Sequence, residues 1–240
     1  PGKFEKSKTH YESDRYIVSY AIGHLVTIEF PEEIDPRYKE WKLENLPILP
    51  EEFPLKGLDN TKSQLSALQQ LIRRKDVGEI INACDAGREG ELIFKYILRY
   101  VWNQTVAKQT FKRLWLQSMT KEAIKDGFAH LRGNEEMQSL EDAALCRSES
   151  DWLIGINATR ALTGFNSRKG GFFLTPCGRV QTPTLSLIVK REQARLSFVP
   201  RAYFNLLATF RLDHDQYTGK WIDPEFVKNE KDPHAKADRI

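Results

Sequence analysis

The sequence predicts an α/β domain with a mostly parallel sheet and helices on both faces, followed by a mainly α-helical domain and the start of a β-rich domain. Strand-like and helix-like segments alternate up to about residue 131, which is typical of layered α/β folds with parallel pairing. Helical periodicity then continues to residue 195 without a strand signal. We therefore expect domains at residues 1–131, 132–196 and 197–240, the last one incomplete.

The first domain is predicted to open with a strand, an irregular segment and a helix. Residues 15–23 are rich in β-branched and aromatic side chains and end at a glycine, as strands often do. Five prolines interrupt residues 31–54, so an ordered surface segment is expected there instead of a regular element. Thr61 then stands where it would cap a helix whose leucines recur at helical spacing up to Ile72.

Two strand–helix pairs are predicted next. The short apolar run at 79–84 is typical of a buried strand, and it leads through an acidic turn into a helix at 92–101. A second strand is expected at 111–116. Thr120 is then placed to cap a helix that runs to about residue 131.

Beyond residue 132 the pattern becomes helical. Apolar residues near a 3.6-residue period predict one long helix over 134–165 and a second helix over about 178–195. Strand character returns at 203–210, and residues 213–240 are polar and charged. This last part is predicted to be the beginning of an incomplete domain.

Composition indicates a globular chain. Its 240 residues, 40% of them hydrophobic, are enough to bury a substantial core. No segment approaches the roughly 18 apolar residues of a membrane span, and the first residues do not resemble a secretory signal, so we expect a cytoplasmic protein with no membrane partner. The three cysteines are odd in number and far apart, which predicts ordinary buried thiols instead of disulfides or a zinc site.

Positive charge is concentrated in the second half of the chain. Residues 147–201 carry nine basic and three acidic side chains, a balance of +6, whereas the net charge of the whole chain is +3. The remainder therefore sums to about −3. Such asymmetry is expected of a surface that holds a polyanion, and a solvated helix face is the alternative.

The turn after the strand at 79–84 is the first candidate site. Asp85 and Glu89 leave the end of a buried strand, where open α/β sheets place their ligands. Two such carboxylates suit Mg²⁺, which takes one or two of them together with water and phosphate. Glu91 begins the next helix and has a favourable charge near its positive end. A solvated turn with a helix-capping acid is the alternative.

Residues 80–94, Ile-Ile-Asn-Ala-Cys-Asp-Ala-Gly-Arg-Glu-Gly-Glu-Leu-Ile-Phe, resemble the Asp-x-Asp-Arg-Glu-Gly-Glu motif of the Toprim domain, which topoisomerases, primases and some nucleases share. The resemblance implies metal binding by Asp85, Glu89 and Glu91 and a catalytic role for Glu89. Gly87 stands where the motif has its middle aspartate, so Mg²⁺ binding is expected to be weak or absent. No acid-bearing strand followed by Lys-Pro-Ser precedes residue 16, and the chain is expected to begin after that strand.

Residues 175–184, Thr-Pro-Cys-Gly-Arg-Val-Gln-Thr-Pro-Thr, resemble the Ser-Ala-Gly-Arg-Val-Gln-Thr-Pro segment of type IA DNA topoisomerases. The resemblance implies that Arg179, Gln181 and Thr182 face single-stranded DNA. The chemistry is suitable, because a helix start offers free amide donors and arginine forms a bidentate clamp on phosphate. A structural ion pair is the alternative role for Arg179.

Four other residues match motifs of the same family. Arg147 and Asp151 lie on one helical face and match its Arg-x-x-x-Asp pattern, which implies DNA contacts, with an ion pair within the helix as the alternative. Arg113 matches an arginine of the second Toprim strand, with a catalytic or an orienting role. His24 matches a Gly-His turn near bound DNA, with a purely structural histidine as the alternative.

These motifs occur in the family's order over residues 15–210, and Trp41 with Pro-Ile-Leu-Pro at 47–50 resembles the topoisomerase III branch. The resemblance implies relaxation or decatenation of DNA: a tyrosine cleaves one strand transiently, Mg²⁺ assists, and a second strand passes through the gap. The family's nucleophile lies in a Tyr-x-Arg-Thr segment, and none of the eight tyrosines has that context.

The chain alone is therefore expected to bind single-stranded DNA, as a monomer and without a small-molecule substrate, but not to cleave it. The alternatives are a non-catalytic single-stranded-DNA-binding module and another Toprim enzyme, a primase or a nuclease.

Overall fold

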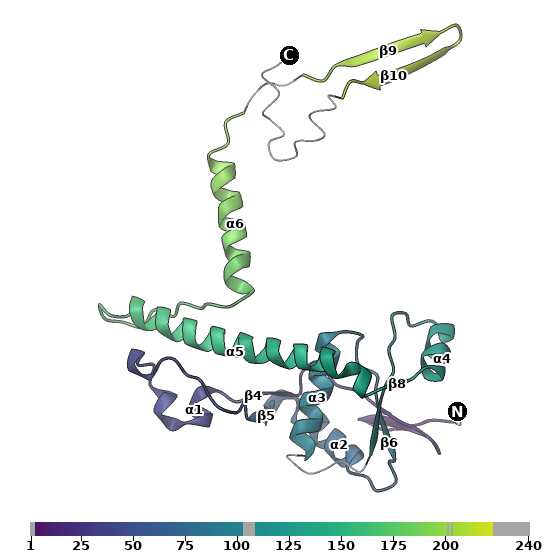
Figure 1. Cartoon of the computed structure of the whole chain (residues 1–240), viewed down its shortest axis with the longest axis vertical. Coiled ribbons are helices and arrows are strands. Elements are labelled where there is room, and N and C mark those ends of the chain that lie inside the picture. Colours follow the sequence, from purple (N-terminus) through teal and green to yellow (C-terminus); the bar gives the residue numbers. More distant parts are fainter. Residues whose placement is uncertain (1–2, 103–108, 201, 203, 223–240) are drawn as a thin grey trace. The chain divides into compact units, whose positions relative to one another are not determined.

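The computed structural model describes residues 3–102, 109–200, 202 and 204–222. The chain forms two compact units, Pro1–Pro183 and Thr184–Ile240. Figure 1 shows the elements of both in sequence colours. An α/β part followed by a helical part confirms the predicted fold class, whereas the domain limits at residues 131 and 196 stay predictions.

The chain opens with a small antiparallel sheet of β1 (Glu5–Lys6), β2 (His10–Glu12) and β3 (Ile17–Ser19). The strand predicted at 15–23 is confirmed in its middle, and it pairs with β2. Sequence reasoning missed β1 and β2 because both consist mainly of polar residues.

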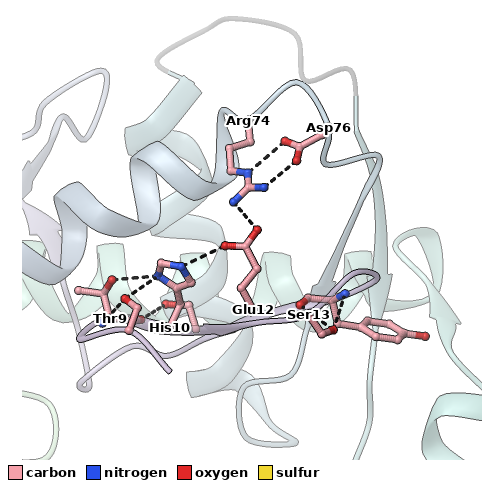
Figure 2. A network of polar contacts seen from close by, with 9 residues as sticks. Thr9, His10, Glu12, Ser13, Arg74 and Asp76 are labelled. Atoms are coloured by element: carbon pink, nitrogen blue, oxygen red, sulfur yellow. Dashed lines mark hydrogen bonds and ion pairs between the residues drawn. The ribbon is translucent and has the colours of Figure 1, made fainter. Parts of the chain in front are cut away.

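A chain of ion pairs fastens this sheet to the end of α2 (Lys62–Ile72). Figure 2 shows that His10 of β2 contacts Glu12 of the same strand, that Glu12 reaches Arg74, and that Arg74 in turn reaches Asp76. The Glu12 Oε1 to Arg74 Nη1 distance is 2.8 Å, and Arg74 Nη2 lies 2.6 Å from Asp76 Oδ2. Because all these side chains are partly or largely exposed, the network orients the sheet more than it stabilises it.

Residues 31–54 form an ordered segment, as predicted, between β4 (Val26–Ile28) and its antiparallel partner β5 (Leu55–Gly57). The segment folds into short turns of helix, α1 (Pro31–Ile34), η1 (Pro36–Lys39) and η2 (Leu43–Asn45). It is not purely a surface segment, since Ile48 is fully buried. The Ile48 N–H donates to Asn157 Oδ1 at 2.6 Å, and Asn157 Nδ2 donates back to Ile48 O at 2.9 Å.

The central sheet confirms the predicted strand–helix alternation. Strand β6 (Glu79–Asn82) pairs in parallel with β7 (Thr110–Arg113), and α3 (Arg88–Trp102) connects them. Helix α4 (Lys121–Ala129) follows β7.

The expectation of a mostly parallel sheet needs correction. Among the described strands, β6 and β7 form the one parallel pair, and β8 (Arg132–Gly133) joins β7 antiparallel. Strand β3 pairs with the neighbouring β2 in a separate sheet and does not join the central one, which has three strands among the described residues.

The two predicted helix caps differ. Thr120 Oγ1 accepts a hydrogen bond from the Ala123 N–H at 3.2 Å, so its cap is confirmed. Thr61 precedes α2 as predicted, but its hydroxyl donates to Leu58 O at 3.2 Å and does not cap the helix. The turn η3 (Asp59–Thr61) holds Thr61 in this conformation.

The long predicted helix is η4 (Glu135–Met137) followed by α5 (Gln138–Asn166). Its amino-terminal half packs on α3, and the core fills the space between α2, α3, α5 and β4. Ten buried residues make up this core: Leu25, Val26, Ile28, Leu65, Leu92, Tyr96, Ile97, Val101, Ala144 and Leu145. Helix α6 (Gln181–Leu196) confirms the last predicted helix, three residues later than expected.

The second unit contains an antiparallel hairpin of β9 (Leu207–Leu212) and β10 (Asp215–Lys220). The strand predicted at 203–210 is thus shifted toward the carboxyl terminus, and Tyr203 and residues 223–240 lie outside the described residues. Sequence reasoning missed β10 because its residues are mostly polar. Within the described ranges, none of the helices has both the length and the apolar character that crossing a membrane requires.

Candidate functional site

Hydrogen bonds from the buried side chain of Arg113 support the acidic turn that follows β6. This arginine is 1% exposed, and its guanidinium donates to the carbonyl oxygens of Asn82, Cys84, Asp85 and Leu114 at 2.6–3.0 Å. The parallel pairing of β6 and β7 puts Arg113 opposite Asn82, directly beneath the turn. Arg113 therefore fixes the path of the backbone that carries the acidic side chains.

Glu91 belongs to this support. Its Oε1 accepts from Arg113 Nε at 2.5 Å, and its Oε2 accepts from Asn82 Nδ2 at 3.0 Å. Both carboxylate oxygens are thus engaged inside the fold, where the side chain is 5% exposed. The structure places Glu91 apart from the two exposed acids of the turn.

Asp85 and Glu89 are exposed on the other side of the turn. Gly90 allows this arrangement, because a Cβ at position 90 would collide with the Asp85 carbonyl oxygen. Both acids line a groove of about 500 Å³ beside β6 and α3. Gly87 is the half-buried turn residue between them, and a Cβ there would meet no atom within 4 Å.

Glu89 also lines a second cleft, of about 280 Å³, which gathers several predicted residues. His24, in the loop before β4, forms a hydrogen bond with Glu89 through Nε2. Arg147 and Asp151 reach the same cleft from α5. The cleft therefore joins a carboxylate from the turn to an arginine of the helical part.

Arg179 joins this cluster through Asp151. Its Nη1 donates to Asp151 Oδ1 at 2.8 Å, while Arg147 Nε lies 3.8 Å from Asp151 Oδ2. One carboxylate thus holds two partly exposed arginines close together. Such a pair offers a phosphate group several N–H donors at once.

The start of α6 follows directly. Gln181 and Thr182 are exposed, and Thr182 Oγ1 accepts from the Gly178 N–H at 3.1 Å. The Thr182 hydroxyl also contacts Cys177 Sγ at 3.4 Å. Thr182 therefore shapes the entry into α6 next to Arg179.

Tyr96 and Ser148 are among the cleft residues that sequence reasoning missed. The Tyr96 hydroxyl donates to Ser148 Oγ at 2.8 Å and bridges α3 to α5. Burial raises the pKa of Tyr96, against a smaller lowering by this hydrogen bond. A signal was present, because Tyr96 stands seven residues after Glu89 and so lies on the same face of a helix.

The cysteines differ from expectation. Cys84 and Cys177 are partly buried, but Cys146 is exposed, so the prediction of three buried thiols is wrong for Cys146. Its place on the outer face of α5 explains this. Burial raises the pKa of Cys84, and the nearby Arg113 guanidinium lowers it by less.

Potential metal ligands are sparse. Within residues 3–102, 109–200, 202 and 204–222, no three His, Cys, Asp or Glu side chains come close enough together to hold an ion. Asp85 and Glu89 alone meet the modest demand of Mg²⁺, which is commonly completed by water and phosphate oxygens.

Two family models match the chain. Residues 3–119 match the Toprim domain, and residues 135–239 match the family described as DNA topoisomerase. The acidic turn falls in the first range, and Arg147, Asp151 and Arg179 fall in the second.

Curated proteins show the same similarity. The chain is 44% identical to DNA topoisomerase 3 of Bacillus licheniformis over 220 residues, which cover 91% of this chain and 28% of that protein. It is 42% identical to DNA topoisomerase 3 of Shouchella clausii over 219 residues and to that of Bacillus subtilis over 220 residues, with the same coverage. The chain thus spans about 28% of the length of these relatives.

Proposed function

This chain belongs to the type IA DNA topoisomerase family, as a relative of bacterial DNA topoisomerase 3, and from that premise we propose that it holds one DNA strand at the cleft between its acidic turn and α5. In the whole protein, that strand is cut transiently and another strand passes through the gap. The partner of this chain is single-stranded DNA, in the cytoplasm of a bacterium, and the chain acts as a monomer.

One observation carries the proposal: Glu89 of the turn and Arg147 of α5 line the same cleft. A strand at this place would meet a cation for its phosphates beside a carboxylate that organises the reacting phosphate. In the part of this stretch that belongs to the first unit, residues 147–183, five basic side chains stand against two acidic ones, a balance that attracts a polyanion.

Each predicted residue has a role in this proposal. Arg147 and Arg179 bind phosphate, and Asp151 holds both arginines ready for it. His24 orients Glu89 through their hydrogen bond. The start of α6 contributes Gln181 and Thr182 next to the strand.

Arg113 and Glu91 act differently. Both side chains are almost fully buried and bonded to each other, so we assign them the positioning of the turn and not a contact with DNA. Glu89 remains the one acid of the turn that faces both the groove and the cleft.

Asp85 and Glu89 are the residues that would hold Mg²⁺. They fit the ion because both are exposed on one turn and because magnesium usually takes one or two carboxylates. The ion would supply positive charge beside the phosphate. With glycine at position 87, affinity is expected to be low in the absence of DNA.

The eight tyrosines of this chain lack the Tyr-x-Arg-Thr context of the family's nucleophile. The 240-residue chain therefore binds DNA without cleaving a strand. A Toprim primase or nuclease is disfavoured, since residues 135–239 match the DNA topoisomerase family.

A metal-independent single-strand-binding module is the second candidate. Gly87, which stands where the resembling motif has its middle aspartate, favours it. Binding of a fluorescent single strand, measured with and without Mg²⁺, separates the two. If the chain acts as part of a topoisomerase, Mg²⁺ strengthens binding of the single strand and Asp85→Ala removes this gain. Arg179→Ala weakens binding of the strand under both proposals.

Relaxation of supercoiled plasmid by the chain alone would overturn the expectation of binding without cleavage. No detectable binding to single strands at low salt would overturn the proposed function itself.

A further inference from the structure

Helix α5 carries an exposed stripe from the cleft to its carboxyl end. Arg147 and Phe165 are 18 residues apart, which is five whole turns at 3.6 residues per turn, so both face the same way. Ile154 and Leu162 are exposed near the same line. We call Arg147, Ile154, Leu162 and Phe165 the α5 stripe.

The stripe ends at a basic loop. Arg168 and Lys169 follow α5 directly, and Gly170 and Gly171 turn the chain with φ angles of 99° and 83°, which side chains disfavour. The sequence contains no acidic residue from 152 to 191. The charged side chains of this stretch of sequence are therefore all basic.

Aromatic rings stand beside these cations. Phe172 is 66% exposed, and its ring and that of Trp41 pack edge-on with 5.7 Å between their centroids. The Arg168 guanidinium lies 4.7 Å from the centre of the Phe165 ring. Rings that are held by a neighbour and still exposed offer a surface on which unpaired bases stack. We call Phe165, Arg168, Lys169 and Phe172 the α5 tip.

We propose that the α5 tip is a second contact for the DNA strand, separate from the cleft at Glu89 and Arg147. The strand leaves the cleft, follows the α5 stripe for about 27 Å at roughly 1.5 Å per residue, and stacks a base on Phe172. Arg168 and Lys169 bind its phosphates. This inference rests on the proposed function, because it extends the same strand.

The chemistry of the tip selects the occupant. Exposed rings interleaved with cations are the arrangement by which proteins hold single strands without regard to sequence. Paired bases in a duplex would not present their faces to Phe172. Continuity with the arginine pair of the cleft gives the strand its direction along α5.

Fluorescence anisotropy with oligonucleotides of two lengths tests this inference on the 240-residue chain. Single-strand sites span roughly 4 to 16 nucleotides, so a strand of about 4 nucleotides can occupy the cleft alone and one of about 16 can reach both contacts. Phe172→Ala is expected to weaken binding of the long strand about tenfold, with much less effect on the short one.

Matched variants sharpen the test. Phe128→Ala removes another exposed ring, on α4, and is expected to leave both affinities unchanged. Lys169→Ala is expected to make long-strand binding less dependent on salt. The slope of log binding constant against log salt concentration should fall in magnitude by about 0.7, the value for one phosphate contact with a single strand. Lys125→Ala on α4 is its control.

The outcomes separate the two proposals. If the unaltered chain binds neither strand, the proposed function fails. If the chain binds the long strand and Arg147→Ala weakens that binding while Phe172→Ala does not, the proposed function stands and the role of the α5 tip as a second contact is refuted. Equal losses with Phe172→Ala and Phe128→Ala would also refute it. Quenching of 2-aminopurine in the long strand, lost with Phe172→Ala, would support stacking directly.

Discussion

Arg113 and Glu91 form an ion pair at 2.5 Å in which the side chains are only 1% and 5% exposed. The pair joins β7 to the first turn of α3, and Arg113 also binds the carbonyl oxygens of Cys84 and Asp85. The exposed acids of the turn are thus positioned by an almost fully buried ion pair.

Glu91→Leu is expected to destabilise the fold strongly. The variant leaves the Arg113 charge buried without its partner, which typically costs about 3–5 kcal/mol. Urea denaturation followed by circular dichroism measures the free energy of unfolding. Lys42→Ala breaks an exposed pair with Glu40 and should leave the unfolding curve in place. A Glu91→Leu curve that overlaps with it would show that the buried pair is dispensable.

Gly90→Ala tests the close approach of α3 to the turn. The added Cβ would collide with the Asp85 carbonyl oxygen, and relief requires a backbone shift that costs about 1–3 kcal/mol. Gly87→Ala is the matched control, because a Cβ at position 87 meets nothing within 4 Å. Thermal unfolding of both variants measures the difference in stability between them. Equal melting temperatures would mean that the turn adjusts to the added Cβ at position 90 without cost.

Much of the α/β arrangement was predictable because periodicity reports burial. The apolar run of β6 and the helical spacing of α2 and α5 reflect faces that pack into one core. Polar strands carry no such signal. Strands β2 and β10 form because each pairs with a neighbouring strand in an antiparallel hairpin. Such pairing depends on the geometry of the turn more than on hydrophobicity.

The sequence could predict which residues belong to the candidate site, but not which of them contact one another. The motifs pointed to Glu89 and Arg147, yet neither spacing nor composition reveals that they share a cleft, since 58 residues separate them in sequence. The division between exposed Asp85 and buried Glu91 was equally hidden. It depends on Arg113, which reaches the turn through the register of β6 and β7.

Arg179→Ala is expected to weaken single-strand binding and to reduce its dependence on salt. One lost phosphate contact lowers the log–log slope by about 0.7. Anisotropy titrations at a series of salt concentrations give this slope. Arg195→Ala removes an exposed arginine paired with Glu192 on α6 and serves as the control. An unchanged slope in Arg179→Ala would assign Arg179 to structure alone.

Acid should weaken the link between α1 and β5. The hydrogen bond from Lys56 and, after it, that from the Phe30 N–H lower the pKa of Glu33 below its ordinary value of 4.5. A lowered pKa means that the stabilisation is present above pH 4.5 and is lost as the pH falls through the lower pKa of the folded state. Because Glu33 is well exposed, the effect is about 0.5 kcal/mol.

Glu33→Gln should abolish that part of the pH dependence, and high salt should reduce it in the unaltered chain. Urea denaturation at pH 6 and at about pH 3 measures the difference. If the two proteins lose the same stability on acidification, the Lys56 contact does not contribute.

Gly87→Asp tests the proposed Mg²⁺ site most directly, because it places a third carboxylate between Asp85 and Glu89 on a position with free space around it. More carboxylate ligands raise the affinity for a hard cation, here on the order of tenfold. Isothermal titration with Mg²⁺ in the absence of DNA measures this gain, and Gly78→Asp, also with nothing within 4 Å, controls for added charge. A gain that persists when Glu89→Gln is combined with Gly87→Asp would show that the ion binds elsewhere, since the site depends on both flanking acids.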